Sequence, residues 1–65
     1  MDKLTILTRA YHYTLLMYEK EKERNDNYRD KYDEDNLISL SVMRSYEIEA
    51  DELRDMIIKI KDKEV

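Results

Sequence analysis

The sequence predicts an all-α fold: an antiparallel two-helix hairpin with coiled-coil-like packing. Apolar residues recur at alternating steps of three and four in both halves of the chain, which places them on one face of a helix. The 65 residues include no glycine and no proline, the residues that most often interrupt helices. We therefore expect one domain, residues 1–65, with helices at about 2–32 and 37–63 and a turn at 33–36.

The clearest helical pattern lies in the second half of the chain. An apolar seam runs along one helix face there, through Met43, Tyr46, Ala50, Leu53, Ile57 and Ile60. Lysines cluster in the last turns of this expected helix, where the negative end of the helix dipole favours cations. They are Lys59, Lys61 and Lys63.

The first half of the chain carries a matching seam of heptad positions. Asp2 precedes it, where an acidic residue suits the positive end of the helix dipole. Asn25 allows two interpretations: a polar seam residue that fixes the register, as in coiled coils, or a solvated position in the charged half of the helix. One line of the seam is Leu4, Tyr11, Tyr18, Asn25 and Tyr32, and its companion is Leu7, Thr14, Glu21 and Tyr28.

The segment Asp33-Glu34-Asp35-Asn36 is the expected turn. In the absence of glycine, Asn36 is the residue best able to adopt a left-handed conformation, and Asp35 or Asn36 can cap the second helix. Folding the chain here brings Tyr18 opposite Ala50, a large residue against a small one. The serines near the start of the second helix, Ser39 among them, are interpreted as capping or surface residues.

The hairpin leaves apolar residues that one neighbouring helix cannot cover. A second apolar stripe lies on an adjacent face of the first helix, and further uncovered apolar residues lie at the start of the second helix. If two hairpins paired antiparallel, the apolar residues at the start of each second helix would cover the stripe on the first helix of the other copy. We therefore expect a homodimer that forms a four-helix bundle. Its predicted interface consists of Ile6, Ala10, Tyr13, Met17, Leu37, Ile38 and Val42.

No pattern in the sequence indicates a catalytic site, a metal site or a cofactor. Small chains are often stabilised by disulfides, a metal or a partner, but the chain has no cysteine and one histidine. Metal ligands at helical spacing from His12 are missing, and nothing in the sequence resembles a nucleophile with a base held beside it. We therefore expect a non-enzymatic protein that associates with itself.

The chain contains no apolar run long enough to span a membrane and no secretory signal. These features predict a cytoplasmic protein. Lys, Asn, Ile and Tyr are frequent, as in AT-rich genomes, which suggests a low-GC bacterium, its phage or another mobile element as the source.

Charge is distributed unevenly along the chain. Residues 33–55 contain eight acids against two arginines, a net of −6, whereas the other residues carry +2. Four carboxylates form an acidic ridge on the second helix, expected to lie away from both seams: Glu47, Asp51, Glu52 and Asp55. A solvated face is one interpretation. The functional interpretation is a surface that attracts a basic partner, such as the DNA-contacting face of a regulator, which would make the protein a regulator or inhibitor acting by protein–protein binding.

RNA binding by a helical dimer is an alternative from another class of function. It would use the basic residues of the first helix: Lys20, Lys22, Arg24, Arg29 and Lys31. In length and heptad layout the chain resembles the Rop family of plasmid copy-control proteins, which are antiparallel dimers of helical hairpins. The resemblance implies an architecture, and no RNA-contacting residues align.

A third candidate function comes from one short segment. Ser45-Tyr46-Glu47-Ile48-Glu49 resembles the Ser-Gln-Glu-Leu-Asp signature of the helical-hairpin aspartyl-phosphate phosphatases of sporulation phosphorelays, with two identities and two similarities. Tyr46 replaces the glutamine and belongs to the apolar seam, and Glu49 replaces the final aspartate. This resemblance implies a phosphorelay regulator.

Overall fold

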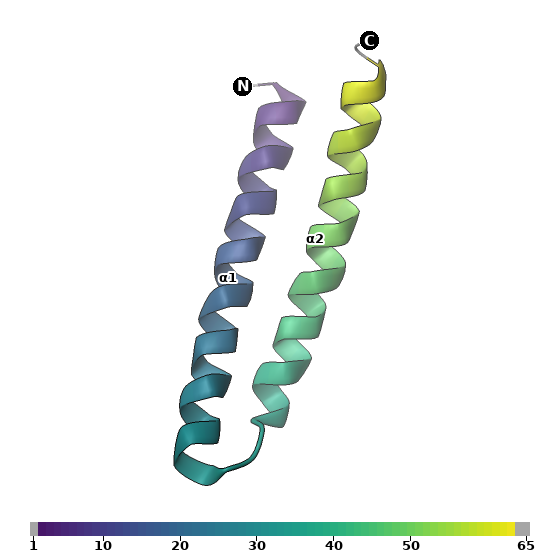
Figure 1. Cartoon of the computed structure of the whole chain (residues 1–65). Helices are drawn as coiled ribbons and strands as arrows, with labels where there is room; N and C mark the ends of the chain where they lie inside the picture. Colours follow the sequence, from purple (N-terminus) through teal and green to yellow (C-terminus); the bar gives the residue numbers. More distant parts are fainter. Residues whose placement is uncertain (1, 64–65) are drawn as a thin grey trace.

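The computed structural model describes residues 2–63. They form α1 (Lys3–Tyr32) and α2 (Leu37–Lys63), two antiparallel helices joined by a short turn (Figure 1). The hairpin is a rod of 51 × 18 × 14 Å. The all-α hairpin expected from the sequence is therefore confirmed, and the helix bounds differ from the expected ones by a single residue at the start of α1.

Asp2 caps the first helix. Its Oδ1 accepts a hydrogen bond from the Thr5 backbone N–H at 2.8 Å. That bond, followed by a contribution from the Thr5 side chain, lowers the pKa of the Asp2 carboxyl below its ordinary value, because hydrogen bonds to a carboxylate favour the charged form. The cap therefore stabilises the fold fully above the unfolded-state pKa of Asp2. Its contribution is lost as the pH falls through the lower folded-state value.

The chain leaves α1 through a left-handed residue. That residue is Asp33, with φ 57° and ψ 33°, and its N–H donates to the carbonyl of Arg29 at 2.8 Å. Among residues 2–63 no other residue has a positive φ, so the prediction of a left-handed Asn36 is wrong. The left-handed residue directly follows the last helical residue, as in helix C-caps generally, and aspartate tolerates this conformation better than most residues.

Asn36 instead caps α2 with its side chain. Its Oδ1 accepts hydrogen bonds from the backbone N–H groups of Ile38 and Ser39, at 3.0 and 3.1 Å. One of the two predicted capping residues is thereby confirmed. The cap satisfies two of the backbone N–H groups that the first turn of a helix leaves without an internal partner.

Asn25 joins the turn to the body of α1. Its Oδ1 accepts the backbone N–H of Asn36 at 2.7 Å, and its Nδ2 donates to Asp35 at 3.2 Å. Asp35 also forms an ion pair with Arg29 at 3.3 Å. Asn25 is 6% exposed, so it is not a solvated position. Its bonds run to the turn and fix where α2 begins.

The contact between the helices follows the two predicted seams. All six seam residues of α2 are buried or half-buried, and so is the α1 seam up to Tyr28. Tyr18 and Ala50 border the same interhelical groove, as the predicted pairing requires. Among residues 2–63, four residues are buried: Ala50 and the polar residues Thr14, Asn25 and Ser39.

Two seam assignments differ from the structure. Tyr32 is 54% exposed and its ring lies 4.6 Å from that of Tyr28. A straight helix drifts about 20° per heptad away from a strict seven-residue repeat, and Tyr32 lies four heptads after Leu4. Ser39, interpreted as a capping or surface residue, is 1% exposed. It extends the α2 seam one turn before Met43.

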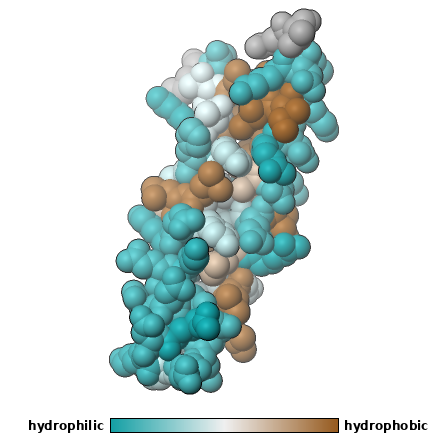
Figure 2. Space-filling model, in the orientation of Figure 1, coloured by the Kyte–Doolittle hydropathy of each residue, from teal (hydrophilic) through white to brown (hydrophobic). Residues whose placement is uncertain are grey.

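Much of the apolar surface remains uncovered in the single hairpin. Ala50 is the one hydrophobic side chain that residues 2–63 bury. Figure 2 shows separate apolar patches near the open end of the hairpin, midway along α1 and near the start of α2. Within the described part of the chain, neither helix has a stretch both long and apolar enough to cross a bilayer.

Candidate partner-binding surfaces

The acidic ridge lies on exposed positions of α2, but two of its carboxylates already have partners. Arg44 binds Glu47 at 3.1 Å and Arg54 contacts Asp51 at 3.6 Å, each three residues apart on the helix. Exposed pairs of this kind contribute only a few tenths of a kcal/mol, so a stronger partner could displace them. No ion pair among residues 2–63 involves Glu52 or Asp55.

One edge of the ridge borders the packed interface. The Glu47 carboxylate lies 3.5 Å from the Tyr18 hydroxyl, and both Glu47 and Asp51 line a groove between the helices. The expectation that the ridge lies away from both seams is therefore wrong for these two residues. The reason is that Tyr18 of α1 packs beside Ala50 on this flank of the seam, so its hydroxyl reaches Glu47, and the groove beside the small Ala50 extends to Asp51.

This interhelical groove has a volume of about 300 Å³. Ala50 has no side-chain atoms beyond Cβ, and the large side chains around it leave the space open. Apart from the two carboxylates, the lining is aromatic and aliphatic: Tyr11, Leu15, Tyr18, Tyr46 and Ala50. The groove therefore combines tyrosine rings, an apolar wall and negative charge.

The predicted dimer interface is largely uncovered in one hairpin. Leu37 and Ile38 are 78% and 77% exposed, and Ile6 and Tyr13 are more than half exposed. Ala10, Met17 and Val42 are half-buried at the edges of the helix contact. None of these seven residues lines the groove, so the groove and the predicted interface are separate surfaces.

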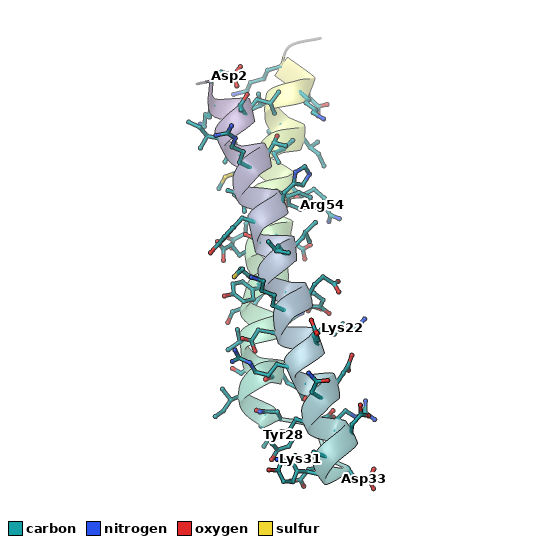
Figure 3. All side chains as sticks on the ribbon, turned by 90° about the vertical axis from the view of Figure 1, so that its left-hand side faces the viewer. Asp2, Lys22, Tyr28, Lys31, Asp33 and Arg54 are labelled. Atoms are coloured by element: carbon teal, nitrogen blue, oxygen red, sulfur yellow. The ribbon has the colours of Figure 1, made fainter. Side chains whose placement is uncertain are left out.

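The five basic residues of the RNA-binding alternative do not form one surface. By helical spacing, Lys22 and Arg29 share one flank of α1, whereas the other three lie on the opposite flank. Arg24 contacts Glu21 at 3.3 Å, an ion pair at i,i+3, and Arg29 contacts Asp35. Figure 3 shows Lys22 along the shaft of the helix and Lys31 near the turn. This arrangement does not favour a continuous phosphate-binding face.

In the segment that resembles the phosphatase signature, Ser45, Tyr46 and Glu47 are each engaged in contacts within the hairpin. Tyr46 is half-buried in the helix contact, and the Ser45 hydroxyl donates to the Ser41 carbonyl at 3.3 Å. Glu47 is held by Arg44. His12 is exposed, with its ring 6.0 Å from that of Tyr11. Among residues 2–63 no group of three metal-ligating side chains is close enough together to hold a metal ion.

Sequence reasoning missed the groove and the role of Asn25. A signal for the groove was present, because Ala50 is the one small residue of the α2 seam and Tyr18 was expected opposite it. The link from Asn25 to Asn36 had no comparable signal, since it depends on the exact path of the turn. Comparison of the chain with protein-family models, with curated proteins and with solved structures found no match.

Proposed function

We propose that the protein is a small, non-enzymatic cytoplasmic regulator that forms a homodimer and binds a basic surface of another protein. The observation that carries this proposal is the uncovered apolar surface of the single hairpin. Among residues 2–63, eleven large hydrophobic side chains are exposed, and Ala50 is the one hydrophobic residue that is buried. Exposed apolar patches on a folded protein often mark protein interaction sites.

The amount of exposed surface supports a second copy as the first partner. The chain exposes 5390 Å², whereas a compact monomer of its mass would expose roughly 4,500 Å². The excess is comparable to the roughly 800 Å² that each partner contributes to a standard protein–protein interface. Two hairpins placed side by side would cover this excess by adding a second layer of helices.

The dimer should be disrupted by charges in the predicted interface. Sedimentation equilibrium of the wild type at micromolar concentration should give twice the chain mass of 8.0 kDa. Replacing Ile6 and Ile38 by aspartate should give the monomer mass, because burying an unpaired carboxylate is costly. The matched control is Ile58→Asp, a change at a similarly exposed isoleucine outside the interface. A cooperatively folding wild-type monomer would contradict the dimer.

Orientation can be tested with introduced cysteines, because the chain has none of its own. Residues 6 and 38 lie at opposite ends of the hairpin. In an antiparallel dimer, oxidation of a mixture of Ile6→Cys and Ile38→Cys chains should cross-link unlike chains. Each variant alone should cross-link poorly. Efficient cross-linking of Ile6→Cys to itself would instead indicate parallel hairpins.

The acidic ridge is proposed to face the second partner. Affinity capture from the native host followed by mass spectrometry would identify that partner. Asp51→Lys with Asp55→Lys should then weaken binding by at least about tenfold, chiefly through slower association, because opposite charges steer encounter. Surface plasmon resonance at two salt concentrations would measure the association and dissociation rates. Added salt should reduce the difference in association rate between the wild type and the double variant.

A charge-matched control distinguishes an effect of the ridge from an effect of the protein's net charge. Asp26→Lys with Asp30→Lys makes the same change at exposed positions of α1 and should leave the affinity within about twofold. Equal losses from both pairs, or none from the ridge pair, would count against the ridge. A host ligand that proves to be RNA, and is lost when Lys22, Arg24 and Arg29 become glutamine, would favour the alternative function.

A further inference from the structure

The interhelical groove has the chemistry to hold one basic side chain. Its floor is Ala50, which is 7% exposed, and half-buried tyrosine rings stand around it. An alkyl chain placed over Ala50 and Leu15 would be removed from water, which is favourable in proportion to the apolar area buried. A purely apolar occupant would leave the charged rim of the groove unused.

That rim fixes the charge of the occupant. Glu47 and Asp51 lie one helical turn apart and both line the groove. Their present partners, Arg44 and Arg54, belong to the same helix, and all four side chains are about half exposed or more. The carboxylates are therefore accessible to an incoming cation. The tyrosine faces attract cations as well, most strongly where water is excluded.

We infer that the groove is an anchor site for an arginine side chain of the basic partner. The aliphatic part would lie over Ala50 and Leu15, and the guanidinium would lie between the tyrosine rings and the two carboxylates. Arginine fits better than lysine, because its flat group stacks on aromatic rings and its several donors can reach two carboxylates. The inference rests on the proposed function in requiring a basic partner, and adds where that partner is held.

The test uses small probes on the full chain, so that no partner is needed. The ¹H–¹⁵N spectrum of labelled protein is titrated with N-butylguanidinium, with N-butylurea, which lacks the charge, and with methylguanidinium, which lacks the alkyl chain. N-butylguanidinium should shift the amides of Leu15, Tyr46 and Ala50 and saturate in the millimolar range. The other two probes should bind about tenfold more weakly, since each loses one class of contact.

Two isosteric double variants locate the site within the ridge. Glu47→Gln with Asp51→Asn should weaken N-butylguanidinium binding by about tenfold, because both charge-assisted hydrogen bonds are lost. Glu52→Gln with Asp55→Asn removes the same charge from the same ridge and should change binding less than about twofold. Equal effects from the two pairs, shifts spread over all acidic residues, or equally tight binding of N-butylurea would overturn the anchor site.

The outcome is independent of the proposed partner interaction. If N-butylguanidinium occupies the groove but ridge reversal, which includes Asp51, leaves partner binding intact, the groove is a guanidinium site and the proposed contact between the ridge and the partner fails. If the probe does not bind specifically while ridge reversal abolishes partner binding, the ridge acts by charge alone and the anchor fails. The comparison of the three probes needs no variant, so it holds even if a double variant folds poorly.

Discussion

Replacing Asn25 by alanine should destabilise the hairpin by about 1–3 kcal/mol relative to the same change at Asn27. Asn25 is buried and holds the Asn36 backbone N–H at 2.7 Å and Asp35 at 3.2 Å. Alanine removes both bonds and leaves the Asn36 N–H without its protein partner. In a domain of this size, each kcal/mol corresponds to roughly 4–8 °C in the melting temperature. Urea denaturation at fixed protein concentration would measure the difference.

Asn27→Ala is the matched control. Asn27 is exposed on the same helix, and alanine has the higher helix propensity, so this change should be neutral or slightly stabilising. Hydrogen exchange supplies a second measurement: Asn25→Ala should increase exchange at the Asn36 amide and at the Ile38 and Ser39 amides that Asn36 caps. Unchanged protection at these three amides would show that the turn does not depend on Asn25.

Leu53→Ala should lower the free energy of unfolding by about 2 kcal/mol, which is at the lower end of the range for leucine truncations in protein cores. Leu53 belongs to the predicted α2 seam and is half-buried in the single hairpin. Half-burial means that part of its surface is exposed before truncation, so less transfer free energy is lost than in a closed core. Chemical denaturation should show a lower midpoint with an unchanged slope.

Ile48→Ala tests whether this loss comes from the seam. Ile48 is 47% exposed and two positions from Tyr46 and from Ala50, so it lies away from the seam on α2. The Ile48→Ala variant should lose less than about 0.5 kcal/mol of unfolding free energy, as is usual for surface substitutions. Both variants must be compared at one protein concentration, because the stability of an associating protein depends on concentration. Equal losses would mean that the assembly buries Ile48 as well.

The sequence by itself determined the fold class and the face on which each helix packs. The apolar steps of three and four from Met43 to Ile60 can lie on one face only of a helix, and the half-burial of those residues confirms it. The cap at Asp2 is also local, because the N-cap oxygen and the Thr5 N–H that donates to it lie within one helical turn. Features set by residues three or four apart are readable from the sequence for this reason.

Only the tertiary structure decided how the turn closes and what borders the helix contact. The left-handed residue is Asp33, whose N–H donates to the Arg29 carbonyl. Asn36 is instead held by Asn25 and caps α2 with its own side chain. Three other features involve residues from different helices, or from a helix and the turn. They are the Asn25–Asn36 hydrogen bond, the burial of Ser39 and the groove over Ala50. Such contacts depend on the separation and rotation of two helices, which the periodicity of either helix leaves undetermined.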